Sequence, residues 1–265
     1  MNTSAFARRY GPWALVTGAS SGLGAEFARQ LAVDGLSLVL VARRTAPMEA
    51  LATELKAKHG IEVRVLGADL SREDEIDRLL AAVEDLEIGL LVNNAGFGVT
   101  GDFLDAPIER NLELLHLNCR APVTLSHALG RKMRDRKRGG IVFTASLAAW
   151  QAMPGWTLYS ASKNWDLMLA EGLHFELKEH GVDVLALCPG ATRTEFGDIA
   201  RASNVFKKNA MNPPEVVAAG LAALGHTTHV VTGWQNKASA ALTRLMPRSW
   251  AARIAKFLMD KLVKE

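Results

Sequence analysis

A tyrosine and a lysine four residues apart, Tyr159 and Lys163, are the first candidates for chemistry in this 265-residue chain. Residues at this spacing share one face of a helix, so the Lys163 ammonium is expected beside the Tyr159 hydroxyl. A free tyrosine, with a pKa of about 10, is a poor acid or base at neutral pH. A cation about 4 Å away, at an effective dielectric constant of about 20, favours the phenolate by roughly 4 kcal/mol, or about 3 pKa units. The pair predicts a proton donor or acceptor that works near pH 7; the alternative is two surface residues that only share a helix face.

A glycine-rich segment at residues 17–24, Thr-Gly-Ala-Ser-Ser-Gly-Leu-Gly, separates a predicted strand from a predicted helix. Glycines here permit a tight turn and let the backbone approach a pyrophosphate, which the free N–H groups at the start of the helix attract. The spacing is Gly-x-x-x-Gly-x-Gly rather than the commoner Gly-x-Gly-x-x-Gly of dinucleotide sites. We interpret the segment as a phosphate-binding loop; the alternative is an ordinary glycine-rich turn.

Two arginines, Arg43 and Arg44, follow the second predicted strand. A cofactor without a 2′-phosphate usually meets an acidic residue there, which binds the ribose hydroxyls. A guanidinium group suits a phosphate instead, so this position predicts NADPH over NADH; a pair of solvated arginines is the alternative. Asp69, after the third strand, either accepts a hydrogen bond from an adenine amino group or caps the next helix.

The elements that must position these residues alternate between short apolar strands and longer amphipathic helices. This pattern predicts an α/β fold: a doubly wound parallel sheet (Rossmann fold) of about seven strands with helices on both faces. The predicted strands are Trp13–Thr17, Ser37–Ala42, Glu62–Leu66, Gly89–Val92, Gly140–Ala145, Val182–Leu187 and His229–Val231. The predicted helices are Gly22–Val33, Ala46–His59, Arg72–Asp85, Ile108–Arg136, Thr157–His180 and Pro214–Leu224. We assign residues 1–232 to this domain and residues 233–265 to a helical extension of it.

Three more motifs follow the fourth, fifth and sixth strands, at the edge of the sheet where ligands bind. Residues 93–96, Asn-Asn-Ala-Gly, form a turn where a cofactor ribose should lie. Ser146 lies thirteen residues before Tyr159, and residues 189–194 read Pro-Gly-Ala-Thr-Arg-Thr. In this order and at these intervals, the motifs of residues 10–232 resemble those of the short-chain dehydrogenase/reductase family.

The resemblance implies an oxidoreductase that moves a hydride between NADP(H) and a carbonyl or alcohol carbon. It implies that Tyr159 is the general acid/base, that Lys163 lowers its pKa and holds the nicotinamide ribose, and that Ser146 hydrogen-bonds the substrate oxygen. Asn118, inside the long predicted helix, matches the fourth catalytic member, which holds a water linking Lys163 to solvent; a helix kink is its structural explanation. The residues implied to bind the cofactor are Gly18, Ser20, Ser21, Gly22, Leu23, Gly24, Arg43, Arg44, Asp69, Leu70, Asn94, Ala95, Gly96, Tyr159, Lys163, Pro189, Gly190, Thr192 and Thr194.

One residue departs from the family pattern. Some NADP-dependent members carry Arg or Lys just before the second loop glycine, where this chain has Ser21. The predicted phosphate preference therefore rests mainly on Arg43, with Arg44 in support. The alternative function is a protein that senses NADPH without turnover, or a membrane-associated scaffold. The intact set of catalytic residues argues against a sensor, because a degenerate site would have lost one of them.

Large apolar residues flank the predicted catalytic residues and indicate a hydrophobic substrate, such as an acyl thioester, a steroid-like ketone or a long-chain alcohol. They are Leu147, Trp150, Met153, Trp156, Phe196 and Phe206. Core packing or a subunit contact is the alternative explanation.

The segment after Trp234 carries two amphipathic helical patterns separated by Pro247. From Lys237 to Glu265, seven Lys or Arg residues stand against two acidic ones, a net charge of +5 where the whole chain carries +3. Basic amphipathic helices can lie on an anionic membrane surface. The alternative is a pair of helices that fold over the substrate cleft or against a partner subunit. The tail also resembles that of ketoacyl-reductase and hydroxysteroid-dehydrogenase members of the family.

The bulk composition narrows location and partners. We expect a cytoplasmic protein, because the two cysteines have no metal-ligand spacing and the N-terminus lacks the apolar core of a signal peptide. If the tail binds a membrane, the protein is peripheral to it. The nearly balanced charge argues against nucleic acid, and we assign the basic run at residues 131–138 to a solvated helix end. The spacing of the histidines predicts no metal. Apolar residues on more than one side of the predicted helix Thr157–His180 predict a homo-oligomer, either a dimer or a tetramer.

Overall fold

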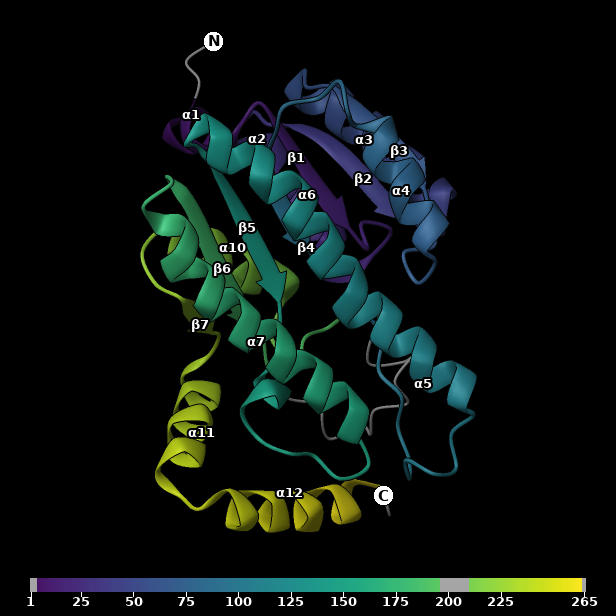
Figure 1. Cartoon of the computed structure of the whole chain (residues 1–265), viewed down its shortest axis with the longest axis vertical. Helices are drawn as coiled ribbons and strands as arrows, with labels where there is room; N and C mark the ends of the chain where they lie inside the picture. The colour runs from purple at the N-terminus through teal and green to yellow at the C-terminus, as the bar shows by residue number, and fades with distance from the viewer. Residues whose placement is uncertain (1–3, 196–209, 264–265) are drawn as a thin grey trace.

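Seven parallel strands form one sheet in the order β3-β2-β1-β4-β5-β6-β7, as seen in a computed structural model that describes residues 4–195 and 210–263 (Figure 1). The strands are β1 (Trp13–Thr17), β2 (Ser37–Ala42), β3 (Val63–Gly67), β4 (Ile88–Asn93), β5 (Gly139–Thr144), β6 (Val182–Cys188) and β7 (His229–Val231). The strand order reverses between β1 and β4, so the loops at their carboxyl ends diverge and leave a crevice there. The predicted doubly wound fold is confirmed.

Helices cover both faces of the sheet. One face carries α2 (Gly22–Val33), α3 (Thr45–His59) and α10 (Pro213–Ala223), and the other carries α4 (Glu73–Ala82), α6 (Ala121–Arg136) and α7 (Thr157–Lys178). Because neither face meets water, the central strands are mostly apolar, and every residue of β4, β5 and β6 is buried. Rigid central strands hold the loops at their ends in fixed positions.

The predicted elements are present, with local differences in their boundaries. The strands β1, β2 and β7 and the helix α2 begin and end as predicted. The helix predicted over residues 108–136 is interrupted: α5 (Ile108–Leu115) passes into a π-helical turn, η1 (His116–Arg120), before α6 begins. The helix α1 (Ala5–Tyr10) was not predicted, because six residues are too few to show a period.

Ion pairs close the end of the sheet opposite the crevice. Arg9 Nε and Tyr10 Oη each donate to Asp183 Oδ2 at 2.7 Å, which ties α1 to the start of β6. The basic run at the end of α6 lies at this same end, where Lys132 Nζ donates to a Glu84 carboxylate oxygen at 2.8 Å. These cations therefore lie far from the predicted cofactor site, as expected.

The tail forms two helices, α11 (Trp234–Leu245) and α12 (Arg248–Val263), which are separated at Pro247 as predicted. α11 packs on η2 (Leu147–Trp150), a short 3₁₀ turn after β5, and α12 crosses the bottom of Figure 1 below α7. None of the helices in the described part of the chain is both long and apolar enough to cross a bilayer.

Candidate active site

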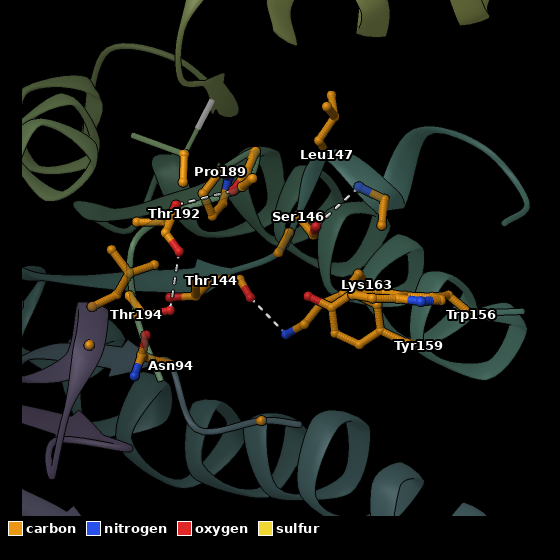
Figure 2. A pocket seen from close by; sticks show the side chains of 18 of the residues that line it. Asn94, Thr144, Ser146, Leu147, Trp156, Tyr159, Lys163, Pro189, Thr192 and Thr194 are labelled. Atoms are coloured by element: carbon orange, nitrogen blue, oxygen red, sulfur yellow. Dashed lines mark hydrogen bonds between the residues drawn. The ribbon is translucent and has the colours of Figure 1, made fainter. Parts of the chain in front are cut away.

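A cavity of about 690 Å³ opens at the carboxyl ends of β1, β4, β5 and β6 (Figure 2). Its walls come from the glycine loop, from the segment after β6, and from η2 and α11. Fourteen of the predicted site residues line it: Gly18, Ser21, Gly22, Leu23, Asn94, Ala95, Gly96, Ser146, Tyr159, Lys163, Pro189, Gly190, Thr192 and Thr194. Most of the residues chosen by motif therefore face one space, although they come from distant parts of the chain.

Tyr159 and Lys163 extend from the first turns of α7 toward Ser146 and the end of β5 (Figure 2). Both residues are 6% exposed, so they lie in a site largely closed to water. Lys163 Nζ donates to the Thr144 carbonyl oxygen at 2.8 Å and to Asp166 Oδ2 at 2.9 Å. The lysine is thus fixed both to the sheet and to its own helix.

The pKa of Tyr159 is raised above its ordinary value, because burial deprives the phenolate of hydration. The Lys163 ammonium and a hydrogen bond with the Ser146 side chain act in the opposite direction, and Asp166 adds to the increase. The prediction that Lys163 brings this pKa down toward 7 is therefore wrong. Lys163 lowers the pKa of Tyr159 only relative to an equally buried tyrosine without a neighbouring cation. The spacing of the two residues in the sequence does not show how deeply Tyr159 is buried.

The Lys163 ammonium keeps its charge in this dry site. Burial lowers the pKa of Lys163, but Asp166 and Tyr159 raise it by a larger amount together, and the net direction is upward. A lysine whose pKa is raised remains a cation at neutral pH. The positive charge next to Tyr159 is therefore present throughout the physiological range.

Ser146 and Asn118 reach the site in different ways. The Ser146 hydroxyl accepts a hydrogen bond from the Ala148 backbone N–H at 3.1 Å, which fixes its side chain at the start of η2. Asn118 is fully buried in η1 and does not line the cavity. Its side-chain oxygen accepts a hydrogen bond from the Phe97 backbone N–H, and its side-chain nitrogen donates to the Phe97 carbonyl oxygen and, at 3.1 Å, to Ser162 Oγ. Asn118 thus lies where the α-helix is interrupted by a π turn, and its water-holding role stays a prediction.

The glycine loop is held by its own backbone and by Asn94. Gly18 and Gly22 have φ values of +68° and +57°, which a residue with a side chain rarely adopts. A Cβ on Gly24 would lie 2.2 Å from the Gly18 carbonyl oxygen, so only glycine fits there. Asn94 Nδ2 donates to the Thr17 carbonyl oxygen at 2.9 Å, and thereby joins the loop after β4 to the loop after β1.

The predicted 2′-phosphate residues lie at the rim, outside the cavity wall. Arg43 is largely exposed and stands 3.6 Å from a Glu113 carboxylate oxygen. Arg44 Nη2 pairs with Glu195 at 2.7 Å and donates to Ser21 Oγ at 3.3 Å. Both guanidinium groups therefore have acidic neighbours, with which a phosphate would compete.

Asp69 and Leu70 occupy a turn beside α4. Asp69 Oδ1 accepts from the Ser71 backbone N–H at 3.0 Å and from the Ser71 hydroxyl at 2.7 Å. Arg72 occupies the N-cap of α4, so the alternative that Asp69 caps this helix is wrong. The Leu70 side chain is buried in the core, which leaves only its backbone for a ligand. Ser20, like these residues, lies outside the cavity wall.

The apolar side of the cavity comes from η2 and the loop after it. Leu147, Trp150, Met153 and Trp156 all line it, as the sequence predicts. The two phenylalanines assigned to the same wall, at positions 196 and 206, lie outside the described residues. Within residues 4–195 and 210–263, no group of three His, Cys, Asp or Glu side chains is arranged to hold a metal ion.

Several residues that shape the site were missed. Asp166 is one, although an acidic residue three positions after Lys163 in an apolar helix was a visible signal. The others lie in α11, where Ser239, Ala240 and Thr243 line the cavity. Asn236, also in α11, packs against Gly190 so closely that a Cβ added to this glycine would lie 2.3 Å from the Asn236 side-chain nitrogen. This close fit confirms for α11 the alternative that the tail folds over the cleft.

Comparison with known proteins agrees with this geometry. The family model described as short chain dehydrogenase matches residues 12–204. A very-long-chain 3-oxoacyl-CoA reductase of Anas platyrhynchos is 32% identical over an alignment of 267 positions that covers 95% of this chain and 84% of that protein. A 7beta-hydroxysteroid dehydrogenase of Clostridium sardiniense is 31% identical, with 82% and 79% covered. The solved structure of a short-chain dehydrogenase from Sphingobium yanoikuyae in complex with NADPH aligns with a TM-score of 0.78 at 35% identity, over 84% of this chain and 87% of that one.

The Gly24→Ala substitution tests whether the close packing of the loop matters for a nucleotide. The added methyl meets the Gly18 carbonyl oxygen, so the loop must move, and we expect NADPH affinity, measured by fluorescence titration, to fall at least about tenfold. Gly172→Ala is the matched control, because Gly172 lies in helix α7 and a Cβ added to it would have nothing within 4 Å. Equal affinities for the two variants would contradict the loop assignment.

Proposed function

Because the chain belongs to the short-chain dehydrogenase family, we propose that it is an NADP(H)-dependent oxidoreductase that moves a hydride between the nicotinamide and the carbonyl or alcohol carbon of a hydrophobic substrate. Tyr159 is the general acid/base in this proposal. The observation that carries it is that the buried Tyr159 and Lys163, together with the partly buried Ser146, line the same cavity as the glycine loop. A nucleotide on that loop and an apolar substrate on η2 would meet at the Tyr159 hydroxyl.

The cofactor, when bound, supplies the hydride. Tyr159 is protonated at neutral pH, because its pKa is raised, and it donates that proton to the oxygen of a ketone during reduction. The Lys163 cation stabilises the phenolate that remains. The Ser146 hydroxyl, held by the Ala148 N–H, orients the substrate oxygen beside Tyr159.

The glycine loop fits a nucleotide pyrophosphate. The side chain of Ser21, the N-cap of α2, makes no capping hydrogen bond, so the N–H groups of the first turn remain available to an anion. The missing Cβ atoms at Gly18 and Gly24 let the loop pack closely against the Asn94–Ala95 turn and against itself, which fixes the start of α2 at the cavity wall. At the rim, Arg44 lies beside Ser21 and Glu195 and Arg43 lies beside Glu113, and both arginines would receive a 2′-phosphate. The NADPH complex of the Sphingobium yanoikuyae relative supports this preference.

The substrate side supports a bulky apolar molecule. Trp150, Met153 and Trp156 line the cavity together with small residues of α11. The acyl thioester and steroid named for the two curated relatives are of this kind. A sensor without turnover is the less favoured function, since Ser146, Tyr159 and Lys163 are all present and line one cavity.

We also propose a homo-oligomeric, cytoplasmic enzyme. Met168 and Phe175 of α7 are 55% and 68% exposed, and a second subunit would cover them. Both cysteines are free thiols, which agrees with a reducing compartment. Elution as a monomer at micromolar concentration would contradict the oligomer.

The outer face of the tail is proposed to contact an anionic membrane surface. Trp234, Leu245, Trp250 and Phe257 are each at least 60% exposed on α11 and α12. Residues 234–258 contain five Lys or Arg and no Asp or Glu. Two copies of so basic a face would repel each other, whereas acidic lipid headgroups would complement it.

Tyr159→Phe tests the proton-transfer role. It removes the hydroxyl and keeps the ring, so we expect turnover of ketones with NADPH to fall at least about 100-fold while NADPH affinity stays within a factor of a few. Tyr10→Phe is the matched control, because Tyr10 is the other of the chain's two tyrosines and lies at the opposite end of the sheet. Near-normal turnover of Tyr159→Phe would sink the proposed mechanism.

Arg43→Asp tests the cofactor preference. An acidic side chain repels a 2′-phosphate and accepts from a ribose hydroxyl, so the ratio of kcat/KM for NADPH to that for NADH should fall at least about tenfold. Arg29→Asp, an exposed arginine of α2 that faces Glu54 at 3.8 Å, is the control. An unchanged ratio in Arg43→Asp would remove this arginine from the cofactor site.

Vesicle co-sedimentation of the full chain tests the membrane contact. Wild type should sediment with vesicles of phosphatidylcholine and phosphatidylserine but much less with phosphatidylcholine alone, and an Arg253→Glu/Lys256→Glu variant should lose binding to the anionic vesicles at least about fivefold. Equal partitioning of wild type and variant would rule the contact out.

A further inference from the structure

Asp166 lies one turn after Lys163 on α7 and makes a buried ion pair with it. The carboxyl group is 3% exposed, and its Oδ2 accepts a hydrogen bond from Lys163 Nζ at 2.9 Å. Its other oxygen, Oδ1, is buried and has no hydrogen-bond partner within the described part of the chain. A buried carboxylate that is only half satisfied is costly, so its place beside the lysine needs a reason other than packing.

The pair fixes the position of the lysine. An ammonium group has three N–H donors, and here the Thr144 carbonyl and Asp166 occupy two of them. The third is left for the cavity, where Tyr159 and a ribose would lie. Without Asp166, the flexible four-carbon stem of Lys163 would be held at its tip only by Thr144.

The carboxylate also changes the field at Tyr159. The lysine charge favours the phenolate, whereas the Asp166 charge opposes it. The other titratable groups that face Asp166 are the thiols of Cys119 in η1 and Cys188 at the end of β6. Burial raises the pKa of these thiols to about 11 and about 12, so both are neutral near pH 7. Lys163 and Asp166 therefore set the local charge between them.

We propose that Asp166 is a positioning residue for the reaction: it holds the Lys163 ammonium in place and offsets part of its charge, and so sets the pH range over which Tyr159 exchanges its proton. This inference rests on the proposed function of Tyr159. Burial raises the pKa of Asp166 to about 6, with Lys163 acting to lower it, so the carboxylate is charged at pH 7 and becomes neutral in mildly acidic solution.

The Asp166→Asn variant removes the charge and keeps the shape and one acceptor for Lys163. Because the opposing charge is gone, the Tyr159 phenolate becomes easier to form. The alkaline limb of the pH profile of kcat/KM for ketone reduction, where Tyr159 must be protonated, should move to lower pH by about one unit. The acidic limb for alcohol oxidation should move in the same direction. An unmoved profile in an active, folded variant would overturn the proposal.

Two controls separate the field effect from a general loss of structure. Asp183→Asn changes another buried, ion-paired aspartate, at the opposite end of the sheet, and its pH profile should match that of wild type. Asp166→Glu keeps the charge and should restore most of the wild-type profile. If Asp166→Glu shifts as far as Asp166→Asn, the charge is not responsible and the proposal fails.

The wild-type protein gives a second reading that does not depend on the folding of any variant. For alcohol oxidation, log kcat/KM should rise with pH at unit slope except near pH 6, where ionisation of Asp166 makes the phenolate harder to form and flattens the curve. An unbroken unit slope from about pH 5 to about pH 7.5 contradicts the inference. If Tyr159→Phe loses activity while the wild-type profile keeps an unbroken slope, the proposed function stands and only the role of Asp166 is rejected.

Discussion

The burial of one positive charge, the Lys163 ammonium, beside the Tyr159 hydroxyl is the interaction on which the rest of the site depends. A cation in a dry site is costly unless its donors are used and its charge is balanced. The Thr144 carbonyl at the end of β5 and the Asp166 carboxylate one turn along α7 provide both. The central strands and α7 must therefore be rigid and in register before the tyrosine can act as an acid. The continuous burial of β5 and β6 supplies that rigidity.

The nucleotide side of the cavity is held together by one asparagine side chain and by close backbone packing at glycines. Asn94 bonds the Thr17 carbonyl, and the glycines beside it leave no room for a Cβ, so the loops after β1 and β4 form one surface. The substrate side of the cavity is lined by side chains of different sizes, because aromatic residues of η2 and the loop after it face small residues of α11. The nucleotide side thus depends on a few glycines and one asparagine at fixed spacing, which a sequence motif reports, whereas the substrate side depends on the shapes of individual side chains. This division explains why the chemistry of the site is easier to infer than its substrate.

Much of the fold and of the site could be predicted from the sequence, because the signals are local. The runs of apolar residues predict the boundaries of β1 and β2 correctly. The spacing of the loop glycines and of Tyr159 and Lys163 predicts which segments line the cavity. The direction of the Tyr159 pKa could not be predicted, since it is decided by burial under residues distant in sequence. The same holds for α11: its contact with Gly190 joins the tail to the loop after β6, and no periodicity reports such a contact. Asp166 stood beside a recognised motif, but its meaning is evident only when its carboxyl is seen to be buried.

The Lys163 charge stabilises the Tyr159 phenolate inside a site whose burial opposes it. The chain has two tyrosines, so tyrosine labelled with carbon-13 at Cζ gives two NMR signals, and a Tyr10→Phe background leaves that of Tyr159 alone. Titration of this signal measures the Tyr159 pKa directly. The Lys163→Met substitution in the same background should move the transition to higher pH by at least about one unit. A transition that stays in place, or moves to lower pH, would contradict the account.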